Sequence, residues 1–115
     1  MSLSDIGVMQ RKLSLNRFVQ LTATTPARLF GLFPMKGTIA VGSDAHLVPF
    51  DPLASQVIRA ESLHSNCDYT LLEGRKLSGR VQNVFLRGNL IVDGPQWLGR
   101  EGMGRFVSRG TVQAF

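Results

Sequence analysis

The most reactive side chains of this sequence lie in one short stretch near its middle. His64, Cys67 and Asp68 follow one another closely, and a second histidine, His46, comes earlier in the chain. Imidazole, thiolate and carboxylate groups are the usual ligands of zinc, and a thiolate beside an imidazole can act as a nucleophile. The stretch lacks the paired-ligand spacing of zinc sites. We therefore expect a loop with an inert thiol, and neither a metal centre nor a catalytic cysteine.

Three glycines near the C-terminal end have the spacing of a phosphate-binding loop. They are Gly99, Gly102 and Gly104. Such loops work because a strand precedes them, a helix N-terminus follows them and a Lys-Ser/Thr pair reaches the phosphates. None of these features is indicated by the neighbouring sequence. We interpret the glycines as part of a flexible connector, and we predict no catalytic, cofactor-binding or metal-binding residue in this chain.

The size of the chain limits the architectures that could hold an active site. It has 115 residues, of which 43% are hydrophobic and 18% charged. That is enough for one modest core, but a (β/α)₈ barrel needs about 250 residues and a dinucleotide-binding fold needs several βαβ units. Both are therefore excluded for the chain by itself.

Charge and composition also bear on partners and location. Thirteen Lys and Arg against eight Asp and Glu give a net charge of +5, but the basic residues are scattered along the sequence. Nucleic-acid-binding surfaces cluster their charge, so we expect no nucleic-acid partner. No apolar run is long enough for a membrane span, and a single cysteine forbids an internal disulfide. We expect a cytoplasmic protein without a membrane partner.

The N-terminal third predicts two short helices. Ser14 is a good N-cap, and Leu15, Phe18 and Val19 have the spacing of one apolar helical face that ends near Thr22. A second helix is predicted to start at Thr24-Thr25-Pro26 and to end at Gly31. Helices this short are marginal in water, so we expect them to form a lid on a sheet.

From Gly37 onward the pattern favours strands. Alternation predicts strands over residues 37–41 and 46–50 around a turn at 42–44, where Asp44 is expected to bind the loop backbone. Pro49 cannot donate to a ladder, so the second strand should be at an edge or irregular, and Asp51-Pro52 should end it. A further strand is predicted within 56–61, and a β-hairpin over 84–94 with Trp97 capping its apolar side.

Seven blocks of the sequence carry a resemblance to a known enzyme family. Together they closely resemble the C-terminal part of dihydropyrimidinases and D-hydantoinases, over roughly residues 6–109. In sequence order the blocks are LSLNRFV (13–19), TATTPARLFGL (22–32), KGTIAVGSDA (36–45), FDP (50–52), NCDY (66–69), EG (73–74) and VFLRGNLIVDG (84–94). The chain departs from the family pattern at His46, Pro49 and Cys67, where an acidic, an aliphatic and an aliphatic residue are usual.

The resemblance implies that the chain is one part of a larger enzyme and does not itself carry the catalytic residues. Members of the family open the ring amide of dihydropyrimidines or hydantoins in a zinc-dependent (β/α)₈ barrel, beside a smaller β-sandwich built from both chain ends. Their metal-binding His-x-His, bridging lysine and catalytic aspartate lie upstream, and no position here matches them. The resemblance therefore implies no cofactor in this chain, with zinc belonging to the parent family. A dihydropyrimidinase-like relative that keeps the fold without the metals is equally compatible with it.

These observations lead to one set of expectations. We expect an α+β fold in which short N-terminal helices precede a β-rich partial sandwich. The expected divisions are a flexible leader (1–13), a helical connector from the barrel side (14–36), a sandwich segment (37–98) and a flexible Gly/Arg-rich tail (99–115). The expected function is that of a C-terminal structural fragment of a cyclic amidohydrolase, inactive on its own. The alternative is a free-standing β-rich interaction module, or a non-catalytic subunit that completes a split amidohydrolase.

The expected partners follow from the strands that such a fragment would lack. Unpaired sheet edges and uncovered apolar faces favour strand pairing between chains. We expect self-association through sheet edges or through the C-terminal tail, and association with the missing catalytic barrel.

Overall fold

The N-terminal part of the chain forms one continuous helical run. The structure is a computed structural model that describes residues 12–63 and 66–113. Helix α1 (Leu15–Val19) passes through a π-helical turn (Gln20–Thr24) into helix α2 (Thr25–Leu29). The Oγ of Ser14 accepts the amide hydrogen of Arg17 at 3.2 Å, so the predicted N-cap is confirmed. Gly31, at φ +66°, ends the run as predicted.

The prediction of two separate helices is wrong, and Pro26 explains how they are joined. Thr24 has helical backbone angles, and its hydroxyl donates to the Gly37 carbonyl oxygen at 2.7 Å instead of capping a new helix. Proline has no N–H to donate to the carbonyl four residues earlier, and its ring crowds that carbonyl. The wider π turn just before it, in which the Thr25 amide donates to the Gln20 carbonyl, accommodates the ring without breaking the helix.

Residues 36–49 contain no regular strand, which corrects the predicted strand over 37–41. Ile39 is 86% exposed, and the described residues offer its segment no neighbouring strand. A β-ladder forms only between two strands, so alternating side chains in one segment are not sufficient to make it a strand. The second predicted strand, over 46–50, is reduced to one bridge between Leu47 and Phe85 before β1 begins. The irregularity predicted at Pro49 is thus confirmed.

Two small antiparallel sheets form the rest of the fold. Strand β1 (Phe50–Val57) pairs with β2 (Lys76–Val81), and β3 (Asn83–Leu86), β4 (Asn89–Asp93) and β5 (Gln96–Trp97) form a meander. A short 3₁₀ helix (Ala60–Ser62) follows β1. Asp51-Pro52 does not end a strand as predicted: it lies in β1 at a register shift between Asp51 and Ser55. The strand expected within 56–61 is only the end of β1.

The hairpin predicted over 84–94 is confirmed. Strands β3 and β4 are joined at Arg87 and Gly88, whose φ angles are +48° and +78°. Two successive positive φ angles define the type I′ turn, which has the right-handed twist that a two-residue hairpin requires. Trp97 pairs with Val92 at the end of this sheet but remains more than half exposed.

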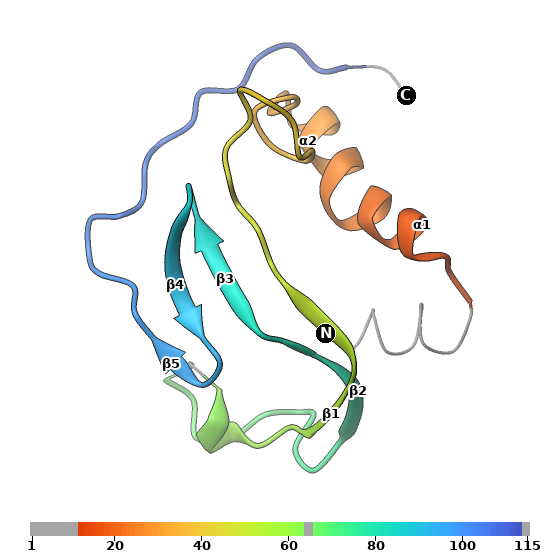
Figure 1. Ribbon diagram of the computed structural model, residues 1–115, viewed down its shortest axis with the longest axis vertical. Helices are drawn as coiled ribbons and strands as arrows, with labels where there is room; N and C mark the ends of the chain where they lie inside the picture. The colour runs from red at the N-terminus through yellow and green to blue at the C-terminus, as the bar shows by residue number, and fades with distance from the viewer. Residues whose placement is uncertain (1–11, 64–65, 114–115) are drawn as a thin grey trace.

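The segment after β5 crosses back to the helical run (Figure 1). It has no helix or strand, yet the Gly110 amide donates to the Gly31 carbonyl at 2.7 Å and the Gln113 amide to that of Arg28 at 3.3 Å. The aromatic side chain of this segment, Phe106, is 93% exposed and does not hold it in place. The contacts that hold the segment are instead made by its backbone and by the Gln113 side chain, which donates to the Phe33 carbonyl.

The core of the described part is very small. Among residues 12–63 and 66–113, only two hydrophobic residues, Ala27 and Leu77, are buried, and Leu77 is the one large side chain that is fully enclosed. Helices and small antiparallel sheets together make an α+β chain, as expected. None of the described helices has the length and apolar character to span a membrane.

Candidate functional site

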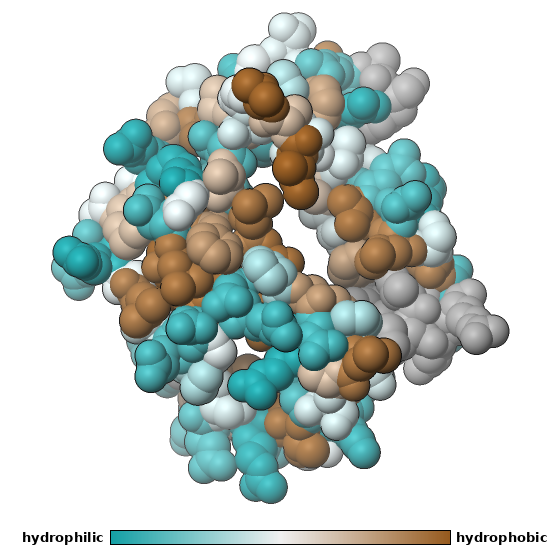
Figure 2. Space-filling view, viewed as in Figure 1, coloured by the Kyte–Doolittle hydropathy of each residue, from teal (hydrophilic) through white to brown (hydrophobic). Residues whose placement is uncertain are grey.

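An open apolar cleft separates the helical run from the strands. Its volume is about 960 Å³. In Figure 2 it is visible as a hollow through the middle of the molecule, bordered largely by hydrophobic residues. It is lined by Leu15, Phe18, Val19, Thr22, Ala23, Thr24, Lys36, Gly37, Thr38, Ile39, Asp44, His46, Leu47, Val48, Phe50, Pro52 and Val81.

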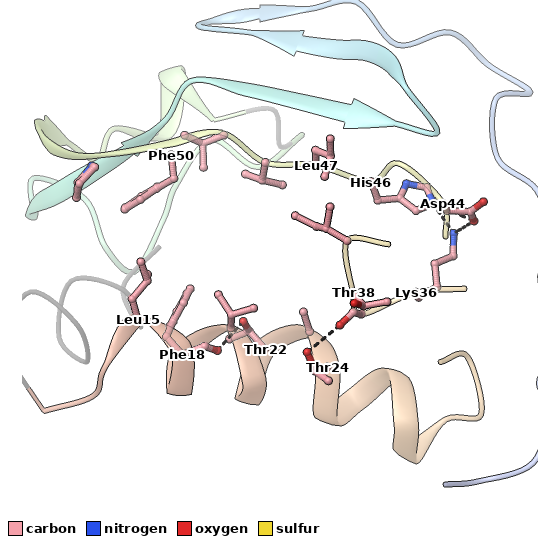
Figure 3. Close-up of a pocket in the computed structure, with 17 residues that line it drawn as sticks. Leu15, Phe18, Thr22, Thr24, Lys36, Thr38, Asp44, His46, Leu47 and Phe50 are labelled. Atoms are coloured by element: carbon pink, nitrogen blue, oxygen red, sulfur yellow. Dashed lines mark hydrogen bonds and ion pairs between the residues drawn. The ribbon is translucent and has the colours of Figure 1, made fainter. Parts of the chain in front are cut away.

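One wall of the cleft is the apolar face predicted for the first helix. Leu15 and Phe18 point from the helix into the cleft, opposite Leu47 and Phe50 (Figure 3). The sequence predicts that this face packs on a sheet as a lid. The described residues do not fill the space between the two walls, so Leu15 and Val19 remain exposed.

Three polar side chains form a cluster at one end of the cleft. The Lys36 Nζ donates to Asp44 Oδ2 at 2.5 Å and also contacts His46 Nε2, while His46 Nε2 and Asp44 Oδ2 are 3.4 Å apart. The hydrogen bond from Lys36 holds the pKa of the Asp44 carboxyl below its usual value. All three side chains are partly exposed.

This cluster is suited to holding a loop and not to binding a metal. Lys36, Asp44 and His46 lie on either side of the turn at residues 41–43, and their contacts close that loop. A divalent cation at Asp44 and His46 would have to displace the Lys36 ammonium group, which carries the same sign of charge. Within the described ranges no group of three or more His, Cys, Asp and Glu side chains could hold a metal ion. The residues present therefore do not fit a zinc centre.

Within the described part of the chain, the residues first considered for metal binding or nucleophilic chemistry form no shared site. His64 lies outside the described residues. Cys67 is exposed, and Asp68 lines a second, smaller pocket with Arg59 and Glu73. His46 lies in the apolar cleft, in contact with Lys36.

The glycine spacing near the C-terminal end has no phosphate-binding geometry. Among the described residues, no helix follows Gly99, Gly102 or Gly104. A Cβ at Gly99 would lie 2.3 Å from the Trp97 indole, so this glycine is required for packing.

Sequence reasoning missed the Lys36 cluster and the cleft itself. Asp44 was expected to bind the loop backbone, but its carboxylate accepts from Lys36 and only its backbone groups bond within the loop, to Met35 and His46. One signal was available: Lys36 and Asp44 have opposite charges and flank a Gly-Ser turn. No sequence pattern indicates the cleft, because the cleft exists only where the helical run and the strands do not pack against each other.

Comparison with known proteins places the chain in a family. The amidohydrolase family profile matches residues 3–91. A D-hydantoinase of Streptomyces coelicolor is 44% identical over 113 residues, and one of Geobacillus stearothermophilus is 48% identical over 108 residues. The first alignment covers 98% of this chain and 24% of the relative; the second covers 94% and 23%.

Solved structures give the same relationship. The dihydropyrimidinase of Brevibacillus agri superposes with a TM-score of 0.93 at 47% identity, over 97% of this chain and 24% of that protein. An L-hydantoinase of Arthrobacter aurescens superposes at 0.88 with 34% identity, over 93% and 24%. The chain thus spans about a quarter of the length of the relatives it matches. On the profile match and these superpositions, the chain belongs to the amidohydrolase family.

Proposed function

We propose that this chain is the C-terminal structural part of a D-hydantoinase- or dihydropyrimidinase-like cyclic amidohydrolase. The reaction of such an enzyme is the metal-dependent hydrolytic opening of a hydantoin or dihydropyrimidine ring. In this proposal residues 14–36 connect to a catalytic barrel, residues 37–98 supply strands of a small β-sandwich, and residues 99–115 form a tail. The names of the relatives support the reaction class. The chain contributes scaffold, and the hydrolytic machinery lies elsewhere.

The observation that carries the proposal is the apolar cleft, which the described residues leave uncovered. Its lining is mostly aliphatic and aromatic, yet residues such as Leu15, Val19 and Ile39 are exposed. A soluble protein rarely leaves a contiguous apolar surface of this kind without a partner. Since the relatives are about four times longer, the natural cover is the part of the fold that this chain does not contain.

The polar groups of the cleft also support a structural role. Hydrolysis of a ring amide needs an activated water and a group that polarises the carbonyl. The Asp44 carboxylate is held by the Lys36 ammonium, and His46 contacts the same ammonium. The proposal therefore assigns zinc binding to residues of the parent enzyme that lie outside this chain.

Two measurements on the full chain test the proposal. The purified chain is first incubated with zinc and assayed for metal content and for opening of hydantoin and dihydrouracil; we expect no stoichiometric metal and no turnover. It is then co-expressed with the Streptomyces coelicolor D-hydantoinase polypeptide from which the matching quarter has been deleted. We expect the two to co-purify and to recover ring-opening activity. Turnover by the chain alone, or failure of the two polypeptides to associate, would overturn the proposal.

A matched pair of variants tests whether the cleft is the docking surface. Val19 and Leu29 are 47% and 46% exposed on the same helical run, but only Val19 lines the cleft. We expect Val19→Asp to abolish association with the complementary polypeptide, because it would bury a charge, and Leu29→Asp to leave it nearly unchanged. Equal effects of the two substitutions on association would show that the cleft is not the docking surface.

A further inference from the structure

The imidazole of His46 lies between two charged neighbours at one end of the apolar cleft. Its Nε2 contacts the Lys36 Nζ and lies 3.4 Å from Asp44 Oδ2, and the same Asp44 oxygen accepts from Lys36 at 2.5 Å. Figure 3 shows the three side chains meeting at this end. An ammonium group has hydrogens to donate and no lone pair. The hydrogen bond from Lys36 therefore requires an imidazole whose Nε2 is unprotonated.

No further titratable side chain of the described residues lines the cleft. The helical run contributes apolar residues and threonines to the lining, and β1 and β2 contribute apolar residues. On the β3 side, the Arg87 guanidinium donates to the Met103 carbonyl. Within the lining, Lys36 and Asp44 are thus the charged groups that face His46, and the protonation state of the imidazole decides the net charge at this end of the cleft.

Protonation of His46 changes both the contacts and the charge of the cluster. With a neutral imidazole, the Lys36 ammonium and the Asp44 carboxylate balance each other. A protonated imidazole has no lone pair on Nε2, so the hydrogen bond from Lys36 is lost and two cations compete for one carboxylate. One unbalanced positive charge then remains. Imidazole is the side chain that changes its charge between about pH 5 and 8.

We propose that His46 makes docking of the cleft depend on pH, so that the rest of the enzyme binds more tightly when this imidazole is neutral. The inference rests on the proposed function, in which a complementary polypeptide covers the cleft. Covering the cleft removes the partly exposed cluster from water. Burying a balanced ion pair beside a neutral imidazole costs less than burying an unbalanced charge. Docking therefore favours the neutral form, and by linkage acid weakens docking.

Affinity for the complementary polypeptide at two pH values is the first test. The probe is the Streptomyces coelicolor D-hydantoinase polypeptide that lacks the matching quarter, and its own titrating groups are the same for every variant. Between about pH 7.5 and pH 5.5, the wild-type chain should lose about tenfold more affinity than His46→Gln, because a Gln amide oxygen can accept from Lys36 and does not titrate. His64→Gln, at the only other histidine of the sequence, should respond like wild type.

The outcomes separate this inference from the proposed function. Circular dichroism at both pH values checks that each chain is folded. Binding at pH 7.5 with equal pH responses of wild type and His46→Gln would overturn the inference and leave the proposed function standing. A response that is lost in His64→Gln would also overturn the inference, because it would assign the titration to the other histidine. Absence of binding at both pH values would overturn the proposed function and this inference together.

The tautomer of His46 in the isolated chain is the second test, and it needs no partner. Because Nε2 accepts from Lys36, the hydrogen of the neutral ring belongs on Nδ1. Nitrogen-15 NMR of the imidazole at about pH 8 should show this tautomer in the wild-type chain. Lys36→Met should shift the population toward Nε2–H, which can then donate to Asp44. An Nε2-protonated ring in the wild-type chain, or an unchanged tautomer in Lys36→Met, would overturn the inference.

Discussion

Two regions of this molecule have similar apolar residue types, but one forms a paired hairpin and the other forms no strand. The hairpin of β3 and β4 and the segment at residues 37–41 both carry apolar, partly β-branched residues beside glycine turns. The hairpin is fully formed because its two strands are adjacent in sequence and pair with each other. Residues 37–41 have no strand beside them in the described chain and form no ladder. The difference shows that β-propensity yields a strand only where a partner is within reach.

The same contrast appears in the distribution of buried surface. Leu77, in β2, is 1% exposed, whereas the side chains that line the cleft are mostly half-buried or exposed. We therefore expect the stability of the isolated chain to reside in the paired sheets, and the cleft side to contribute to association.

The largest effect is expected at Leu77. Leu77→Ala should lower the free energy of unfolding by about 2–5 kcal/mol, because it opens a cavity in the best-enclosed part of the fold. Leu53→Ala, in the paired strand β1 but at a side chain that is 90% exposed, should change it by less than about 0.5 kcal/mol. Urea denaturation followed by circular dichroism measures both. A small effect at Leu77 would mean that the sheets are not the stable region.

Two glycines with positive φ angles test whether the same backbone strain costs more stability in the paired hairpin than in the unpaired segment. Gly88 and Gly42 have φ angles of +78° and +89°, and a Cβ at either would meet nothing within 4 Å. Gly88→Ala should destabilise the chain by about 1 kcal/mol, because the type I′ turn of the hairpin fixes that conformation. Gly42→Ala should cost less than half as much, because its unpaired segment can relax. Equal costs in urea denaturation would contradict the contrast between the two regions.

The polar cluster at the end of the cleft predicts an acid-dependent contribution. Because Lys36 lowers the pKa of folded Asp44, the charged carboxylate stabilises the fold above the pKa of the unfolded chain, near 4. That contribution is lost as the pH falls through the lower folded pKa. The difference in unfolding midpoint between wild type and Asp44→Asn should be constant between about pH 5 and 6 and should close below about pH 4.

A control for this titration follows from the exposure of the cluster. The side chains of Lys36 and Asp44 are partly exposed, so 0.5 M salt should reduce the difference at pH 6. A difference that grows as the solution is acidified would show that Asp44 is not stabilised in its charged form.

The smallest effect on stability is expected at Ile39. Ile39→Thr should change the free energy of unfolding of the isolated chain by no more than about 0.5 kcal/mol, since the side chain is already exposed. Val84→Thr, at a paired and partly buried position of β3, should cost about 1 kcal/mol or more. If Ile39→Thr proved the more costly change, residues 37–41 would have to pack on something in the isolated chain.

The sequence predicted those features that depend on neighbouring residues. Ser14 as an N-cap, Gly31 as a helix end, the irregularity at Pro49 and the β-hairpin over 84–94 are all confirmed. Each is decided within a few residues by capping, by positive φ or by a missing donor. The apolar face of Leu15, Phe18 and Val19 was also visible in the sequence, but not the fact that it borders an open cleft.

The features that were predicted wrongly depend on contacts between distant residues. Thr24 carries the residue type of an N-cap, yet its hydroxyl bonds to Gly37 and the helix continues through it. Asp51-Pro52 has the composition of a strand end, yet pairing with β2 carries β1 past it as a register shift. In both cases a contact with a residue distant in sequence, Gly37 for Thr24 and β2 for Asp51-Pro52, is favoured over the conformation that the local residue types prefer.

From its sequence alone, this chain is specified as a small α+β member of an enzyme family, with its helix N-cap at Ser14, its helix end at Gly31 and its β-hairpin within residues 84–94. Only the tertiary structure decided that the helical run and the strands stand apart and that Lys36 joins Asp44 and His46. The physical reason is that caps and turns are satisfied within a few residues. Apolar faces and strand edges are satisfied only by surfaces far away along the chain, and here the described chain does not supply those surfaces.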